Sequence, residues 1–298
     1  MLDFKSNNAI AVQGVIVAFI VLFLKYIAYR VTGSIALYSD ALESIINVAT
    51  AVAALTAVYW SAKPADTNHP YGHTKAEYFS AVLEGVLIVI AAISIFHAAY
   101  NGFLQPRGFA QPVEGLLANG AATLVNAAWC FILLREGRKR RSPALVADGK
   151  HLLSDIVSST GVLAGLVLAV WTGWAILDPL LAALVALAIL WSGWSLVRTS
   201  MSSLMDEAVA PETLERMRQV IAVNAEGAIE AHDIRTRHAG PVTFIDFHLV
   251  VPGSMSVSDA HAICDRIERA LKEMAADAQI TIHVEPEEKA KHRGVVVL

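Results

Sequence analysis

The sequence is poor in cysteine and in charged residues. Its two cysteines, Cys130 and Cys264, cannot form a disulfide framework, and neither belongs to a CxxC pair of the kind that binds zinc. Only 17% of the 298 residues are charged, whereas 55% are hydrophobic, and the mean hydropathy is +0.52. A soluble domain of this length carries more charge. The composition therefore predicts a membrane protein.

Two further absences narrow the possibilities. The N-terminal residues Met1 to Asn8 show no cleavage-site pattern, so the first apolar stretch is expected to be a retained span and not a signal peptide. The sequence also lacks an HExxH pattern, and no spare general base accompanies its polar residues. The missing HExxH pattern and the missing general base weaken the alternative of an intramembrane metallohydrolase.

Six hydrophobic segments have the length of about 20 residues that a membrane-spanning helix needs. They are Ala9–Tyr29, Ser34–Trp60, Tyr78–Phe103, Val113–Leu134, Leu145–Trp171 and Trp174–Val197. The second and fifth segments contain polar residues, which predicts that they face each other around a polar site. Lysine and arginine gather after the second, fourth and sixth segments, so we expect both termini in the cytoplasm.

The last third of the sequence has the pattern of a small soluble domain. It predicts helices over Pro211–Val223 and Ser258–Ala275, and strands over Ala231–His238, Thr243–Val251 and Gln279–Val284. The predicted fold class is an α-helical membrane protein: six transmembrane helices in residues 1–208, then a small cytoplasmic α+β domain of the open-faced sandwich kind in residues 209–298.

Two pairs of polar residues lie four positions apart within the spans: Glu43 with Asn47, and His151 with Asp155. Residues at this spacing share a helix face, so the two segments together offer four ligands to one ion. Two carboxylates neutralise one divalent cation, and in an empty apolar site they favour binding protons instead. We therefore expect metal and protons to compete here. The alternative is a hydrogen-bonded contact between helices without an ion.

A second candidate metal site lies in the loop after the second span. Asp66, His69 and His73 occur within eight residues that are interrupted by proline and glycine. Carboxylate and imidazole groups are common zinc ligands, and a loop can bring them together. A solvated loop with incidental histidines is the alternative.

The cytoplasmic segment holds a third candidate. Four histidines and a glutamate recur on different predicted elements: His232, His248, His261, His283 and Glu285. Residues two apart on a strand share a face, so the last two can act together. A dinuclear site bridged by the carboxylate is a reasonable interpretation, with surface histidines that bind no metal as the alternative.

Four sequence motifs resemble the cation diffusion facilitator family, in particular its bacterial zinc- and iron-efflux members. They are Thr32-Gly33-Ser34 before Asp40 and Glu43, the block Pro64–Glu77, the block Ala147–Asp155, and Ala231–Arg237 with Gly240-Pro241 and Phe247-His248-Leu249. The resemblance extends over nearly all of Ala9 to Glu285.

The resemblance implies a homodimeric antiporter that exports a divalent metal ion in exchange for protons by alternating access. It implies a bacterial inner membrane, a metallochaperone-like cytoplasmic domain with a regulatory and dimerising role, and neither enzymatic activity nor a nucleic-acid partner. The transport site would consist of Glu43, Asn47, His151 and Asp155, and the loop and cytoplasmic sites of the residues named above.

One departure from the family bears on the metal. Zinc-transporting members usually carry histidine or aspartate where this chain has Glu43, and aspartate where it has Asn47. The resulting three oxygens and one nitrogen form a harder set that suits manganese or iron(II). Zn2+ is the first expectation from family frequency, with Fe2+, Mn2+, Co2+ and Cd2+ as alternatives. A membrane-anchored metal sensor or assembly protein without transport activity is the alternative function.

Overall fold

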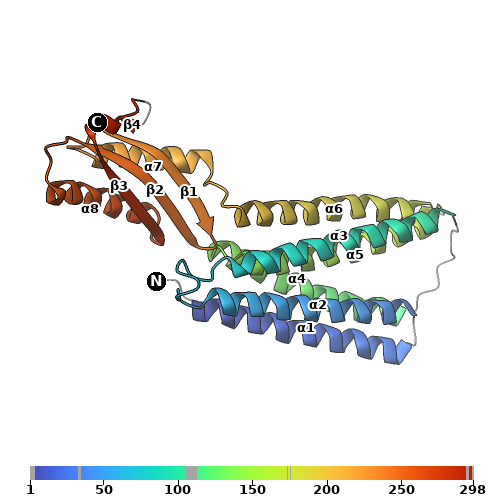
Figure 1. Cartoon of the computed structure of the whole chain (residues 1–298). Coiled ribbons are helices and arrows are strands. Elements are labelled where there is room, and N and C mark those ends of the chain that lie inside the picture. The colour runs from blue at the N-terminus through green and yellow to red at the C-terminus, as the bar shows by residue number, and fades with distance from the viewer. Residues whose placement is uncertain are drawn as a thin grey trace. The chain divides into compact units, whose positions relative to one another are not determined.

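Two compact units make up the structure. The computed structural model describes residues 4–32, 35–104, 113–172, 174, 176–292 and 295–296. A helical unit ends at Met201, and an α+β unit begins at Ser202. Figure 1 shows the long helices α1 to α6 and the strands with their two helices. The helices are α1 (Phe4–Thr32), α2 (Ile35–Ser61), α3 (Ala76–Leu104), α4 (Val113–Lys139), α5 (Pro143–Thr172) and α6 (Leu177–Leu204).

Three stretches of these helices are long and apolar enough to cross a membrane, within the described residues: Asn7–Ile27, Ala76–Leu104 and Ala182–Leu204. Helices α2 and α5 carry the predicted polar residues Asn47, His151 and Asp155. As the sequence predicts, α2 and α5 pack against each other. Helix α5 also contacts α3 and α4, so the helix that carries His151 and Asp155 has neighbours on several sides.

Two apolar clusters hold the helical unit together. The first joins α1, α2, α4 and α5, with Val58 and Leu133 fully buried in it. The second joins α3, α5 and α6 around Ile88. At the crossing of α3 and α6 the backbones approach closely, because a Cβ atom at Gly85 would lie 3.2 Å from the carbonyl oxygen of Gly193. Small residues permit such close packing between membrane helices. Since α5 contributes to both clusters, its position is determined from two directions.

A buried carboxylate joins the ends of three helices. Glu77, at the start of α3, is 1% exposed. It accepts hydrogen bonds from the Ser61 hydroxyl at 2.8 Å, from the Ser142 hydroxyl, and from the Ala144 backbone N–H at 3.4 Å. Ser61 ends α2, and Ser142 precedes α5, where its hydroxyl accepts from the backbone N–H of Leu145. Glu77 therefore links α2 and α5 close to the loop that carries Asp66.

The α+β unit contains α7 (Pro211–Asn224), β1 (Glu230–Ala239), β2 (Val242–Val251), α8 (Val257–Met274), β3 (Ala278–Pro286), a 3-10 helix η1 (Glu287–Lys289) and β4 (Val295–Val296). The sheet order is β3-β2-β1-β4. Strands β1 and β2 are antiparallel, whereas β2 and β3 are parallel and joined through α8. The predicted strands and helices of this segment are confirmed, and β4 is an additional strand that the sequence did not predict.

The core of this unit lies between the helices and the sheet. Met217 from α7, Phe247 and Leu249 from β2, and Ile267 and Leu271 from α8 are at most 1% exposed. The apolar face of α8 follows a helical repeat, and Ser256 caps the helix by accepting from the backbone N–H of Asp259. This core holds β1, β2 and β3 side by side and so determines which of their residues become neighbours.

We predict that Glu77→Ala destabilises the helical unit by about 1–3 kcal/mol, because the buried hydroxyls of Ser61 and Ser142 lose their common acceptor. All six tryptophans lie in the helical unit, so tryptophan fluorescence during denaturation in detergent reports on this unit alone. Ser61→Ala removes one donor only and should have a smaller effect. Denaturation of Glu77→Ala identical to that of the wild type would show that this link contributes nothing.

Candidate metal sites

The Asn47 side chain connects α2 to α5 through two hydrogen bonds. Its Nδ2 donates to Asp155 Oδ2 at 2.7 Å, and its Oδ1 lies 3.1 Å from His151 Nε2. Asn47 and His151 are each 5% exposed, and Asp155 is half-buried. Three of the four residues predicted for the transport site are thus brought together across the helix contact. The fourth, Glu43, lies on α2 one turn before Asn47, and its side chain is outside the described part of the structure.

The geometry assigns roles to the groups of this bridge. Because the Asn47 amide nitrogen donates to Asp155, its oxygen is the atom that faces His151, and Nε2 of that histidine must carry the proton. An amide nitrogen cannot ligate a metal, so a bound ion would need the amide oxygen and the imidazole lone pair instead. The contact that the sequence offered as the alternative to a metal site is therefore present, and it involves the same three residues.

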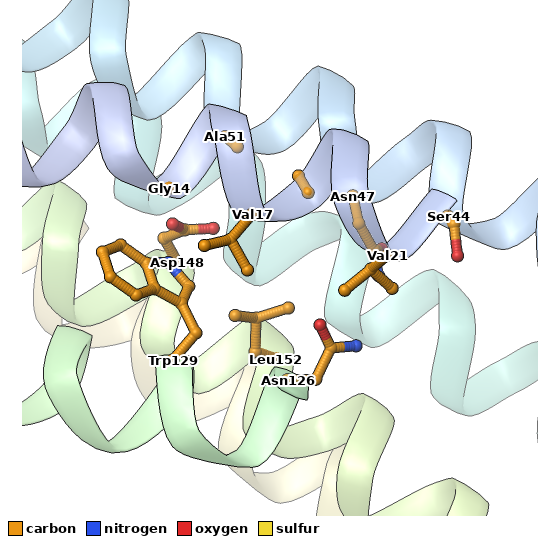
Figure 2. A pocket seen from close by; sticks show the side chains of 11 residues that line it. Gly14, Val17, Val21, Ser44, Asn47, Ala51, Asn126, Trp129, Asp148 and Leu152 are labelled. Atoms are coloured by element: carbon orange, nitrogen blue, oxygen red, sulfur yellow. The ribbon is translucent and has the colours of Figure 1, made fainter. Parts of the chain in front are cut away.

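A cavity lies beside this bridge. It is small and open on one side, and its lining includes Asn47, Asp148, Asn126 and Trp129 (Figure 2). Trp129 is 8% exposed, and its Nε1 has no hydrogen-bond partner among the described residues. A Cβ atom at Gly14 would lie 3.4 Å from that nitrogen and 3.7 Å from Asp148 Oδ2. Glycine at this position of α1 leaves room in front of both polar atoms.

Asp148 lies on α5, three residues before His151. The cavity places it on the lining. Asn126 and Trp129 were not predicted, because isolated polar groups on α4 have no spacing pattern that distinguishes them from ordinary packing residues. Figure 2 shows their side chains directed toward the same space as Asp148.

The predicted loop residues also lie together. The ligand atoms of Asp66, His69 and His73 are all within 4.8 Å of one another. Asp66 Oδ1 accepts from the backbone N–H groups of Asn68 and His69 at 2.9 and 2.7 Å, and Asp66 Oδ2 is 3.4 Å from His73 Nε2. The backbone N–H of His69 holds the pKa of Asp66 below its ordinary value, so the carboxylate is charged at neutral pH. A charged oxygen and two imidazoles form a donor set that fits zinc.

The register of the sheet aligns three of the cytoplasmic histidines. His232 on β1 is directly opposite His248 on β2, and His248 is opposite His283 on β3. The Glu285 carboxylate lies 3.4 Å from His232 Nε2, 3.2 Å from His248 Nδ1 and 3.7 Å from His283 Nε2. One carboxylate thus faces three imidazoles, which is the arrangement that a bridging ligand requires.

His261 differs from the other members of the predicted cytoplasmic set. It lies on α8 with 73% of its side chain exposed, and its ion-pair partner is Asp265, one turn further along the helix, at 3.5 Å. Among the described residues no ring contact or ion pair joins His261 to the three aligned histidines or to Glu285. Its role as a ligand stays a prediction.

Comparison with known proteins agrees with this architecture. Residues 11–205 match the family model described as Cation efflux transmembrane domain, and residues 209–287 match ZT_dimer, described as Cation efflux protein, cytoplasmic domain. The chain belongs to the cation diffusion facilitator family. It is therefore a membrane protein of the metal-cation efflux class, with a helical transmembrane domain followed by a cytoplasmic α+β domain, as predicted. The count of six spans stays a prediction, since three described helices meet the criteria of length and hydropathy.

Similar proteins cover most of the chain. The uncharacterised transporter sll1263 of Synechocystis is 41% identical over 268 residues, which are 90% of this chain and 86% of the relative. The cation-efflux pump FieF of Escherichia coli is 28% identical over 281 residues, 93% of this chain and 91% of the pump. Among solved structures, the zinc form of CzrB, a proposed zinc transporter, is 48% identical over 29% of this chain and 98% of its own, with a TM-score of 0.28.

We predict that Asp66→Asn weakens zinc binding at the loop by at least about tenfold. The asparagine oxygen can still accept from the backbone of the loop, so the loss of charge is separated from a loss of loop structure. Chelator competition with the purified protein measures the stoichiometry and the affinity. Asn68→Ala, which alters the neighbouring exposed side chain, is the control. Unchanged zinc binding by Asp66→Asn would reject this loop site.

Proposed function

We propose that this protein exports a divalent metal ion from the bacterial cytoplasm in exchange for protons, as a homodimer in the inner membrane with both termini in the cytoplasm. The observation that carries the proposal is the Asn47 bridge between His151 and Asp155 at the contact of α2 and α5. Membership of a cation-efflux family supports metal export. The name of the cytoplasmic family model supports the dimer.

The bridge suggests how metal loading is coupled to movement of the helices. In the metal-free arrangement Asn47 satisfies Asp155 and His151 and so connects α2 to α5. When an ion takes its place, the Asn47 oxygen, the imidazole lone pair and the Asp155 carboxylate turn toward the ion, with Glu43 as the fourth ligand. The same residues then hold the two helices through a different geometry. A contact with two such arrangements is what alternating access requires.

Protons compete with the metal for the same groups. Loss of the ion leaves Asp155 and Glu43 in a region of low dielectric constant, where protonation neutralises them. The Asn47 amide donates to Asp155 and so compensates part of its charge until a proton or a cation binds. Metal enters from the cytoplasmic side, and protons replace it after release on the other side.

Zn2+ is the substrate that we place first. FieF is described as a cation-efflux pump and CzrB as a proposed zinc transporter, and these names support a metal cation as the substrate. The transport set of Glu43, Asn47, His151 and Asp155 has three oxygens and one nitrogen, which gives Fe2+ and Mn2+ better ligands than an all-nitrogen site would. Co2+ and Cd2+ are further candidates. The loop and cytoplasmic sites would bind the ion on the cytoplasmic side, the latter in a regulatory role.

The test of this function is zinc uptake into proteoliposomes driven by an acidic interior. We predict that Asp155→Ala reduces this uptake to the level of protein-free liposomes, because the ion loses a charged ligand. Glu136→Gln, which removes a carboxylate of α4 that pairs with Arg140, should retain this uptake. Wild-type uptake by Asp155→Ala would reject the transport site. Zinc binding without gradient-driven uptake by the wild type would favour the alternative function, a membrane-anchored metal sensor without transport activity.

We predict that Asn47→Asp makes transport more sensitive to pH. The substitution replaces the donor that faces Asp155 by a second carboxylate, so the empty site must bind more protons to remain neutral. Zinc should then bind more tightly at alkaline pH and be lost more steeply as the pH falls. The measurement is the KM for zinc uptake as a function of external pH. Parallel pH dependences for the variant and the wild type would contradict this account of proton competition.

A further inference from the structure

Strand β1 contains a bulge at the predicted cytoplasmic metal site. Its register with β2 shifts between His232 and Arg235, and Asp233 adopts a φ of 53°. On a regular strand neighbouring side chains point to opposite faces, so Asp233 would point away from the site of His232. The bulge turns the residue instead, as bulges next to functional sites often do. As a result the Asp233 carboxylate and the ligand nitrogens of His232 and His248 lie within 4.8 Å of one another.

The imidazole of His232 is the second observation that points to a ligand at this place. His232 is 4% exposed, and within the described part of the chain neither of its ring nitrogens has a hydrogen-bond partner. Buried polar atoms are rarely left in this condition unless they serve a ligand or a reaction. Carboxylates face both sides of the ring: Glu285 lies 3.4 Å from Nε2, and Glu230 lies 3.9 Å from Nδ1. Asp233 offers a third charge within the same cluster.

The C-terminal segment lies against the same part of β1. The Lys291 ammonium is 2.6 Å from Asp233 Oδ2. The next backbone N–H, that of His292, donates to Glu230 Oε2 at 3.0 Å, and β4 pairs with Glu230 and Ala231. Three successive contacts of the tail therefore fall on the stretch of β1 that carries His232. The hydrogen bond from Lys291 also holds the pKa of Asp233 below its ordinary value.

We propose that Asp233 is a further ligand of the cytoplasmic metal centre and that Lys291 is a built-in competitor, whose ammonium occupies the cation position at this carboxylate until a divalent metal displaces it. The inference rests on the cytoplasmic centre of the proposed function and adds its regulation. The ligand is a borderline divalent cation such as Zn2+, because two imidazole nitrogens and a carboxylate oxygen form its usual donor set.

The competition follows from charge. One carboxylate oxygen cannot serve an ammonium and a divalent ion at hydrogen-bonding and ligating distance together, since the two cations repel each other. Metal binding therefore breaks the ion pair of Lys291, and the contacts of His292 and β4, which depend on the same placement of the tail, are weakened with it. The cytoplasmic domain then responds to metal by releasing its C-terminal segment.

The test is hydrogen–deuterium exchange of the full-length protein in detergent, with free zinc set by a chelator. Two peptides are followed: the tail, residues 287–296, and the hairpin Glu230–Val251, whose zinc response reports occupancy of this centre. In the wild type we expect the tail to be protected without zinc and to lose this protection as the hairpin responds. His248→Ala should abolish the hairpin response and serves to assign it.

Two variants separate competition from a structural ion pair. Lys291→Met should leave the tail unprotected without zinc. It should also lower the zinc midpoint, which is the free zinc concentration that gives half of the hairpin response, by about two- to fivefold, the range that an exposed ion pair supports. Asp233→Asn, in which asparagine tolerates the positive φ, should also free the tail but raise the midpoint by at least about tenfold. Lys289→Met, which changes an exposed lysine two residues before Lys291, should resemble the wild type.

The outcomes distinguish this inference from the transport function. Midpoints that move in the same direction in Lys291→Met and Asp233→Asn, or a tail that stays protected when zinc saturates the hairpin, would overturn the competition. These results would leave gradient-driven uptake untouched. Conversely, absent uptake together with opposite shifts of the midpoint would reject the antiporter and retain the metal-responsive tail.

Discussion

The contact between α2 and α5 through Asn47 is the interaction on which the rest of the helical unit depends. A carboxylate such as Asp155 is costly at membrane depth unless a donor compensates it, and the Asn47 amide is that donor. The Glu77 cluster joins the same two helices near their other ends. Polar contacts therefore hold helix α5 at two places along its length, and α5 contributes to both apolar clusters.

A common principle relates the three candidate metal sites. In each, a carboxylate already has a donor from the protein: the Asn47 amide for Asp155, the backbone of His69 for Asp66, and the Lys291 ammonium for Asp233. Such donors stabilise the charged form of the carboxylate that a cation would bind. They also weaken metal binding, because the interaction of the carboxylate with the metal must be more favourable than the hydrogen bond that it replaces.

Much of the fold could be predicted from local patterns. Apolar length predicted the long helices, and alternation predicted β1, β2 and β3 nearly to their ends. The spacing of His151 and Asp155 predicted a shared face that the helix then provides. Strand β4 was missed because two residues carry no periodic signal, and its pairing with β1 depends on contacts that lie more than sixty residues away in the sequence.

By itself the sequence determined which residues can act: composition specified a membrane protein, and i, i+4 spacing placed the candidate ligands of α2 and α5 on matching faces. Only the tertiary structure decided what those residues meet. The orientation of Asp233 results from a bulge, which follows from how β1 and β2 register against each other and not from the residues around it. Its partner Lys291 reaches it because the chain returns to β1 after β3. Such pairings arise from packing between distant segments, for which a sequence pattern of short range contains no information.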